Sequence, residues 1–338
     1  MNPAERIALG ETKLAVTRLG LGTAPLGGLF TPVTDADARG TVERAYAIGL
    51  RVFDTAPLYG HGLAEARLGR ALGGKPRDEF VLATKVGRLL RAGAPPDPSQ
   101  FHEGQPFYKV ASPLNPVFDF TYDGVMWSVE ESLFRLGLDR LDILYIHDPD
   151  EHYVEALHGA YPALERLRSE GAIAAVGVGM NQPEMLVRFA RAAPFDCFLV
   201  AGRYSLLDQT ALQELLPLCL ERRIAVVVGG VYNSGILADP RAGATFDYVP
   251  ATSGLIERAQ RLQAVCRDYG VPLKAAALQF PLGHPAVASV LIGCRSAAEV
   301  EENVRLFRTD IPDELWEELR RDRLIPDAAP APRSEAGS

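Results

Sequence analysis

Short apolar segments alternate with amphipathic segments along almost the whole chain. The apolar segments are rich in Val, Ile and Leu, which is typical of strands that are buried on both faces. The amphipathic segments place apolar residues three and four positions apart, as a helix with one buried face does. After an N-terminal hairpin (6–9 and 14–17), the predicted strands are 18–22, 51–54, 79–84, 141–146, 172–178, 196–200, 224–228 and 287–292. The predicted helices are 35–48, 64–72, 124–136, 161–169, 183–192, 211–222 and 255–269.

This alternation predicts a single α/β domain. Eight strands that alternate with helices, with no linker between two halves, favour a closed (β/α)8 barrel of the TIM type over residues 1–325. A doubly wound open sheet shows the same alternation and is the alternative. At the local level, Thr34 is expected to cap the helix that begins at Asp35, and Gly49 to follow its end.

Two segments depart from the alternation. Residues 87–122 contain six prolines and several aromatic residues, and they are predicted to form a long irregular loop after the third strand. A loop of this length inside a compact domain is usually a lid or disordered, and the aromatic residues favour a lid. The low-complexity segment PDAAPAPRSEAGS, residues 326–338, is predicted to be a disordered tail.

Composition and charge narrow the class of protein. The 338 residues are 47% hydrophobic and carry a net charge of −8, which argues against nucleic acid or an anionic membrane as a partner. The four cysteines show no spacing typical of a metal site or a disulfide framework, so neither is predicted. The chain start lacks the apolar core of a signal peptide, and the longest apolar run is too short to span a bilayer. A cytoplasmic protein that acts on a small molecule is therefore expected, and the oligomeric state is left open.

Four polar residues lie at or just beyond the ends of consecutive predicted strands. Asp54 ends the second strand and Tyr59 follows in the next loop, while Lys85 follows the third strand and His147 the fourth. In a parallel barrel all strands end on one face, where active sites are built. We therefore expect these side chains to converge.

The four residues suit proton transfer coupled to hydride transfer. An ammonium at Lys85 is expected to lower the high pKa of the Tyr59 phenol, with Asp54 holding the lysine and His147 orienting the substrate oxygen. A cofactor would carry the hydride. Taken singly, each residue also has a structural interpretation: Tyr59 and Lys85 as ordinary loop residues, His147 as a partner of the following turn, and Asp54 as a helix cap.

Three sequence motifs together resemble those of the aldo-keto reductases. They are FDTAPLYGHGLAEARLGRAL (53–72), ATK (83–85) and LDRLDILYIHDPD (138–150), and the resemblance extends from about residue 16 to residue 307. It implies a catalytic tetrad of Asp54, Tyr59, Lys85 and His147, and a nicotinamide cofactor bound across the barrel mouth without a Rossmann domain. The cofactor contacts expected by resemblance and position are Gly22, Thr23, Asp54, Asn181, Gly229, Gly230, Val231, Tyr232, Asn233, Gly235, Gly293, Cys294, Arg295, Glu299, Glu302 and Asn303. The expected substrate pocket contains Phe30, Leu58 and His147.

Two departures from the family pattern bear on the cofactor. Gly293 stands where NADPH-preferring relatives often have a lysine, and Glu299 where they have an arginine for the 2′-phosphate. A carboxylate repels that phosphate and accepts hydrogen bonds from a free ribose diol, which favours NAD. Two observations keep NADP open: Ser296 and Glu299 also form a capping-box pattern, and Arg295 is available for a phosphate.

The segment GGVYNSGIL (229–237) and the HDPD turn look most like the branch that contains D-threo-aldose 1-dehydrogenases and pyridoxal 4-dehydrogenases. That resemblance implies oxidation of an aldose at C1 to its lactone, with Tyr59 as the base. The alternatives are a pyridoxal dehydrogenase, an NADPH-dependent reductase of aldehydes or ketones, and a cofactor-sensing regulatory subunit.

Overall fold

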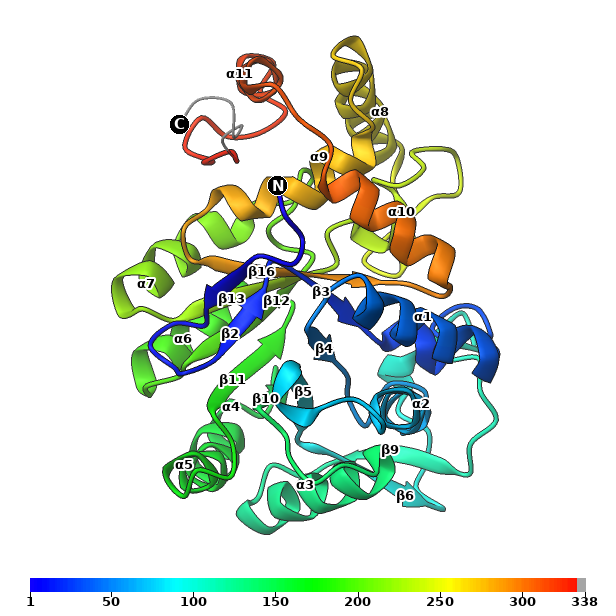
Figure 1. Cartoon of the computed structure of the whole chain (residues 1–338), viewed down its shortest axis with the longest axis vertical. Coiled ribbons are helices and arrows are strands. Elements are labelled where there is room, and N and C mark those ends of the chain that lie inside the picture. Colours follow the sequence, from blue (N-terminus) through cyan, green and yellow to red (C-terminus); the bar gives the residue numbers. More distant parts are fainter. Residues whose placement is uncertain (333–338) are drawn as a thin grey trace.

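The computed structural model describes residues 1–332 and shows a closed barrel of eight parallel strands (Figure 1). Around the barrel the strands follow chain order, and the last strand pairs with the first. This closure confirms the predicted barrel and excludes the open sheet. The barrel strands are β3 (Leu19–Gly22), β4 (Val52–Asp54), β5 (Val81–Val86), β10 (Ile143–His147), β11 (Ala175–Met180), β12 (Cys197–Ala201), β13 (Ala225–Gly229) and β16 (Val287–Gly293).

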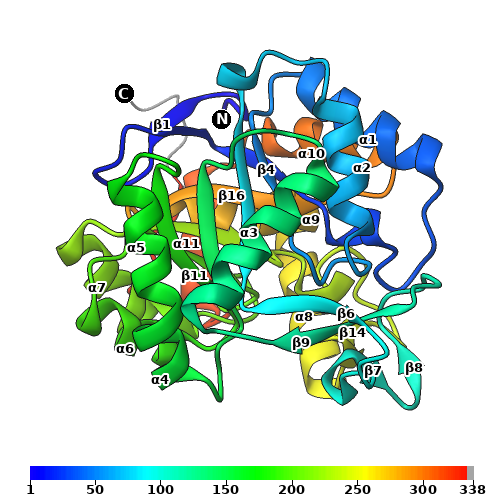
Figure 2. The same ribbon diagram turned by 90° about the horizontal axis from the view of Figure 1, so that it is seen from below.

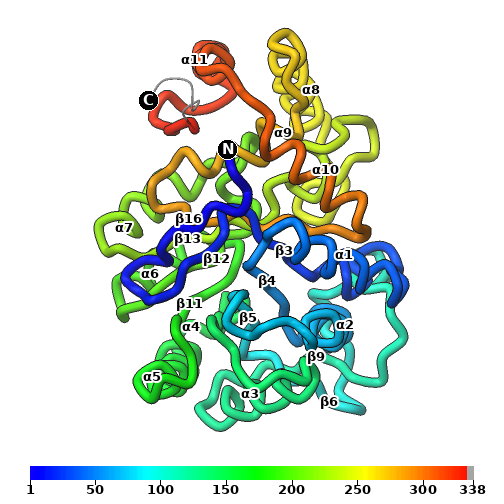
Figure 3. Tube along the Cα trace, in the orientation of Figure 1, coloured from blue at the N-terminus to red at the C-terminus, as the bar shows by residue number. Residues whose placement is uncertain are grey.

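Helices surround the barrel, as the course of the chain in Figure 3 shows. Thr34 caps α1 as predicted, since its side chain accepts a hydrogen bond from the Asp37 backbone. The sequence pattern did not predict α9, because almost all of its side chains are buried and it has no polar face to create a period. The helices are α1 (Asp35–Ala47), α2 (Leu63–Leu72), α3 (Tyr122–Leu136), α4 (Tyr153–Glu155), α5 (Tyr161–Ser169), α6 (Pro183–Ala192), α7 (Leu215–Arg222), α8 (Ser253–Asp268), α9 (Leu273–Gln279), α10 (Ala297–Phe307) and α11 (Asp313–Arg321).

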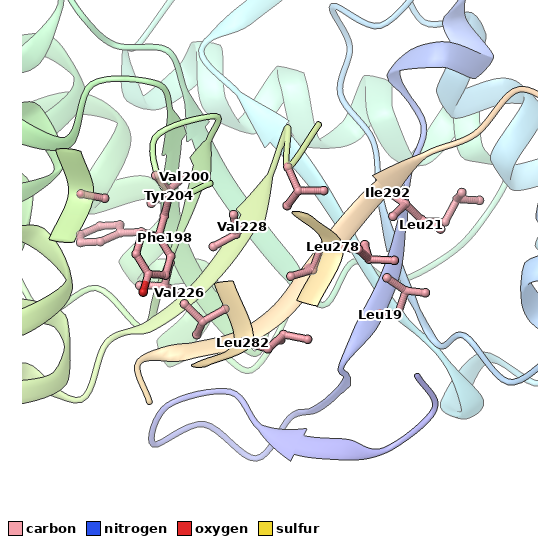
Figure 4. Close-up of a cluster of buried hydrophobic side chains, with 14 of the residues drawn as sticks. Leu19, Leu21, Phe198, Val200, Tyr204, Val226, Val228, Leu278, Leu282 and Ile292 are labelled. Carbon is pink, nitrogen blue, oxygen red and sulfur yellow. The ribbon is translucent and has the colours of Figure 1, made fainter. Parts of the chain in front are cut away.

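Alternating strand residues build two layers of core. One set, which includes Leu21, Val228 and Ile292, points outward and packs against helices; Figure 4 shows these beside Leu278 of α9. The other set fills the barrel and includes Val52, Val81, Ala83, Ile143, Tyr145, Ala175, Cys197, Leu199, Ala225, Val227, Ala288 and Leu291. Buried strands of this kind leave functional side chains only at the strand ends.

An antiparallel hairpin closes the barrel end where the strands begin. It consists of β1 (Arg6–Ala8) and β2 (Ala15–Thr17), as the sequence pattern predicts. Leu9 and Val16 from this hairpin are fully buried in the same cluster as the residues that fill the barrel. The opposite end, where the strands finish, is therefore the one available for a ligand.

The segment after β5 is ordered and contains two hairpins, so its prediction as an irregular loop was wrong. β6 (Arg88–Ala92) pairs with β9 (Leu114–Phe118), and β7 (Phe101–His102) pairs with β8 (Gln105–Pro106). Pro106 and Pro116 are tolerated within strands because each strand of a two-stranded sheet has one unpaired edge, where a missing N–H breaks no hydrogen bond. Figure 2 shows these hairpins on the same side of the molecule as β14 (Thr245–Phe246), which pairs with β15 (Val249–Pro250).

The beginning of the expected disordered tail has a defined position. Ala329 is buried, and its carbonyl oxygen accepts a hydrogen bond from Arg320 on α11. The prediction of disorder is therefore wrong for residues 326–332, because Ala329 is buried and its carbonyl oxygen has a partner on α11. The rest of that segment, 333–338, lies outside the described residues.

Residues 1–332 contain neither a membrane-spanning helix nor a cluster of metal ligands. Within that range no helix combines the length and apolar character needed to cross a bilayer. The same residues contain no group of three or more His, Cys, Asp or Glu side chains arranged to hold a metal ion.

A glycine in α2 allows close packing against α3, and this contact can be tested. A Cβ at Gly69 would lie 1.8 Å from the carbonyl oxygen of Leu136, whereas a Cβ at Gly40 in α1 meets nothing within 4 Å. Gly69→Ala should lower the free energy of unfolding by about 1–3 kcal/mol through overpacking. Gly40→Ala should raise it by about 0.5–1 kcal/mol, because alanine is the better helix former. Urea denaturation of both variants measures the difference, and equal stabilities would contradict the packing argument.

Candidate active site

The ends of three neighbouring strands bring the predicted polar residues together. Asp54 ends β4, Lys85 lies near the end of β5, and His147 ends β10, in the pairing order β4–β5–β10. Tyr59 reaches the same place from the loop after β4, with its ring centroid 5.9 Å from that of His147. The structure thus places all four side chains at the mouth of the barrel.

A buried ion pair lies at the centre of this group. The Lys85 ammonium is 2.6 Å from Oδ1 of Asp54 and donates a second hydrogen bond, of 2.8 Å, to the backbone carbonyl of Thr55. The same nitrogen lies 4.7 Å from the centroid of the Tyr59 ring. Both charged side chains are almost inaccessible to solvent, so each depends on the other for compensation of its charge.

The pKa of Tyr59 is shifted in the direction opposite to the one expected. Burial raises the pKa of the phenol well above its usual value, and the negative charge of Asp54 adds to the effect. The Lys85 ammonium faces the tyrosine ring and directs its hydrogen bonds to Asp54 and Thr55. In this arrangement the Tyr59 hydroxyl keeps its proton at neutral pH.

His147 is a neutral imidazole in this environment. Burial lowers the pKa of His147 well below its usual value, and the positive charges of Lys85 and Arg88 act in the same direction. Its Nδ1 is buried without a hydrogen-bond partner among the described residues, and its Nε2 lies 3.4 Å from Oδ2 of Asp148. A neutral imidazole can orient a substrate oxygen without bringing a charge to it.

A cavity of about 460 Å³ extends from Tyr59 over the ends of β3, β13 and β16 to the start of α10. Most of the predicted ligand contacts line it: Gly22, Phe30, Asp54, Tyr59, Asn181, Gly229, Gly230, Val231, Tyr232, Asn233, Gly235, Gly293, Arg295, Glu299, Glu302 and Asn303. The other predicted residues are buried behind this surface, namely Thr23, Leu58, Lys85, His147 and Cys294. The wall also contains residues that the sequence did not indicate, among them Lys274, Asp247 and Tyr248.

Three loops meet over the cavity through aromatic rings. Phe30 follows β3, Phe107 belongs to the insertion after β5, and Tyr248 lies in the β14–β15 hairpin, with ring centroids 5.8–5.9 Å apart in each pair. The backbone N–H of Phe30 donates to the carbonyl of Phe107, which joins the first two loops. The predicted lid character of the insertion fits this position. No sequence signal pointed to Tyr248, because its hairpin of two-residue strands has no period to detect.

The distal end of the cavity is rich in paired charges. Ser296 caps α10 by accepting a hydrogen bond from the Glu299 backbone, so the capping interpretation holds. The Glu299 carboxylate in turn accepts hydrogen bonds from the backbone N–H and the guanidinium of Arg295. Lys274 forms an ion pair with Glu302, 2.7 Å long. The capping role and a ligand contact are compatible, because Glu299 still lines the cavity.

The residues present fit a nicotinamide dinucleotide. The cavity is elongated across several strand ends, and buried polar atoms at its Tyr59 end have no partner in residues 1–332: Oγ1 of Thr23 and Oδ2 of Asp54. An unpartnered buried polar atom is costly, so a polar ligand group such as a carboxamide is expected to satisfy these atoms.

The contribution of the Lys85–Asp54 ion pair to the free energy of unfolding can be tested with two variants. Lys85→Met leaves the Asp54 carboxylate buried without a counter-charge, which should lower the free energy of unfolding by about 3–5 kcal/mol. The double variant Asp54→Asn/Lys85→Met removes both charges and should be more stable than Lys85→Met alone. Urea unfolding at neutral pH distinguishes the two, and a double variant as unstable as the single one would contradict the pairing argument.

Comparison with known proteins agrees with this geometry. The chain is 46% identical to pyridoxal 4-dehydrogenase of Microbacterium luteolum, over 96% of this chain and 99% of the relative. It is 44% identical to D-threo-aldose 1-dehydrogenase of a Pseudomonas species, over 94% and 98%. It is 33% identical to L-galactose dehydrogenase of Arabidopsis thaliana, over 90% and 88%.

Solved structures show the same architecture. An aldo-keto reductase from Bacillus halodurans superposes with a TM-score of 0.71 over 98% of both chains, at 26% identity. The model of the aldo/keto reductase family matches residues 18–321, which is most of the chain. The chain therefore belongs to the aldo/keto reductase family and is an oxidoreductase that depends on a nicotinamide cofactor.

Proposed function

We propose that this protein is an NAD-preferring dehydrogenase that oxidises an aldose at C1 to its lactone, with Tyr59 as the proton-transfer residue. The observation that carries the proposal is the convergence of Tyr59, His147 and the Lys85–Asp54 pair at one end of an elongated cavity. The 44% identity to a D-threo-aldose 1-dehydrogenase supports the substrate class.

In this proposal Tyr59 transfers the proton, while His147, Lys85 and Asp54 position the reacting groups. During oxidation the hydride leaves C1 of the sugar, its O–H proton passes to Tyr59, and the carbonyl of the lactone forms. His147, neutral and edge-on to the Tyr59 ring, orients the reacting oxygen. Asp54 holds the Lys85 ammonium, which lies 4.7 Å from the centroid of the Tyr59 ring. The bound nicotinamide supplies the hydride acceptor.

The raised pKa of Tyr59 predicts how the rate of oxidation depends on pH. The Tyr59 phenolate is the base in oxidation, and because burial raises the pKa of Tyr59, the phenolate fraction grows with pH throughout the accessible range. The kcat/KM for oxidation should therefore rise from about pH 7 to about pH 9. Tyr59→Phe should lose about 100-fold or more in kcat, keep its Kd for the cofactor, and lose this pH dependence. Full activity in Tyr59→Phe would exclude the role.

The preference for NAD rests on the charges at the distal end of the cavity. Glu299 accepts hydrogen bonds from both the backbone N–H and the guanidinium of Arg295, so a 2′-phosphate would compete with this carboxylate for the arginine. Glu302 engages Lys274 in the same way. A phosphate at this end would meet carboxylates whose neighbouring cations are already paired.

Pyridoxal is the second candidate substrate, and two observations favour it. The identity to a pyridoxal 4-dehydrogenase is 46%, and the aromatic residues Phe30, Phe107 and Tyr248 over the cavity offer faces on which a pyridine ring can stack. An aldose and pyridoxal share the relevant chemistry, because both close to cyclic hemiacetals that oxidation turns into lactones.

A panel of substrates tests the proposal. L-fucose, other aldoses, pyridoxal and simple alcohols are incubated with NAD or NADP, and the reduced nicotinamide is followed by absorbance. We expect the highest kcat/KM with an aldose, and a value about tenfold higher with NAD than with NADP. Glu299→Gln should improve NADP by releasing Arg295, whereas Glu301→Gln, a change on the same helix outside the cavity, should not. Comparable kcat/KM for both cofactors would contradict the preference, and no turnover of any aldose would contradict the function.

A further inference from the structure

The residue after His147 projects a carboxylate beside the candidate reacting group. Asp148 follows the end of β10 with a left-handed backbone (φ 42°), and its N–H donates a hydrogen bond to the carbonyl of Gly179 at the end of β11. A non-glycine residue is rarely held in this conformation unless its surroundings require it. The sharp turn directs the side chain back toward His147, with Oδ2 of Asp148 3.4 Å from Nε2 of the imidazole.

A buried arginine from the insertion holds this carboxylate in place. Arg88, the first residue of β6, lies 3.3 Å from Oδ2 of Asp148 and 3.2 Å from Oδ2 of Asp97. Its guanidinium also packs 4.4 Å from the ring centroid of Phe118. Only 6% of the arginine side chain is exposed. The position of Asp148 is therefore set by a rigid neighbour.

The second carboxylate oxygen of Asp148 is free to bind a ligand. Both contacts described above involve Oδ2, and within residues 1–332 no hydrogen bond reaches Oδ1. About 29% of the side chain is exposed, in contrast to the buried His147 and Arg88. The charge of Asp148 acts on the hydroxyls of Tyr59, Tyr108 and Tyr248. These phenols belong to three separate loops, each close enough to the carboxylate for its charge to raise the pKa of the phenol.

We propose that Asp148 determines substrate specificity by accepting a hydrogen bond from the hydroxyl on the carbon next to the reacting carbon. This proposal rests on the proposed function and adds to it the requirement for a vicinal hydroxyl. Tyr59 and His147 bind the oxygen on the reacting carbon. Oδ2 of Asp148, which Arg88 holds, lies 3.4 Å from the imidazole nitrogen, and the free Oδ1 of the same carboxylate is the acceptor for an oxygen on the neighbouring carbon. A carboxylate accepts hydrogen bonds and donates none, so it selects a hydroxyl.

A cycle of two enzymes, the wild type and one variant, and two substrates tests this contact. The substrates are an aldose that the wild-type enzyme oxidises and its 2-deoxy analogue, and the variant is Asp148→Asn. In the wild type, loss of the 2-hydroxyl should lower kcat/KM about 10- to 100-fold, because a charged hydrogen bond is lost. In Asp148→Asn, the two substrates should differ by no more than about threefold, because uncoupled changes add.

A matched control distinguishes the loss of a substrate contact from the loss of an ion pair with Arg88. Asp97→Asn removes the other carboxylate paired with Arg88, which belongs to the insertion and contacts Nη1 of the guanidinium, whereas Asp148 contacts Nη2. It should leave the ratio between the aldose and its 2-deoxy analogue at the wild-type value. If Asp97→Asn abolishes the ratio, or if Asp148→Asn preserves it, the inference is wrong.

The same experiment keeps this inference distinct from the proposed function. If the wild type oxidises no aldose, the proposed function fails. If the wild type oxidises the aldose and its 2-deoxy analogue equally well, only the role of Asp148 fails.

Discussion

The ion pair between Lys85 and Asp54 is the interaction on which the arrangement of the site depends. A lone charge in this position would have lost its water without compensation, so neither residue can be buried except with the other. The bond joins two adjacent barrel strands at their carboxyl ends, and the lysine nitrogen lies against the ring of Tyr59. Because the buried ion pair fixes the lysine, it also fixes the position of the phenol ring that packs against it. Burial also raises the pKa of the Tyr59 phenol, so the hydroxyl holds its proton at neutral pH.

Closure of the barrel determines where such an interaction can exist. The interior is filled with apolar side chains, and the N-terminal hairpin covers the end where the strands begin. Polar groups therefore remain at the opposite end, where loops from distant parts of the sequence converge. Over the cavity, these loops contact one another through the aromatic rings of Phe30, Phe107 and Tyr248.

Local pairing of charges then shapes the two ends of the cavity differently. At the distal end, Arg295 is paired with Glu299 and Lys274 with Glu302, which leaves little unpaired positive charge for a phosphate. At the Tyr59 end, Arg88 holds Asp148 through one carboxylate oxygen and leaves the other oxygen free. In the first case the pairing disfavours a phosphate, and in the second it fixes the position of a hydrogen-bond acceptor.

The sequence by itself determined the alternation of strands and helices, the hairpin at the start, the cap at Thr34, and the placement of Asp54, Tyr59, Lys85 and His147 at or just beyond strand ends. These features depend on residues close together in the chain, so their periodicity and spacing are readable locally. Only the tertiary structure decided the pairing of β6 with β9, the position of Tyr248 over the cavity, the partner of Asp148 and the direction of the pKa shift of Tyr59. Each of these depends on which distant segment covers or contacts a side chain. That information arises only when the barrel closes and brings the loops together.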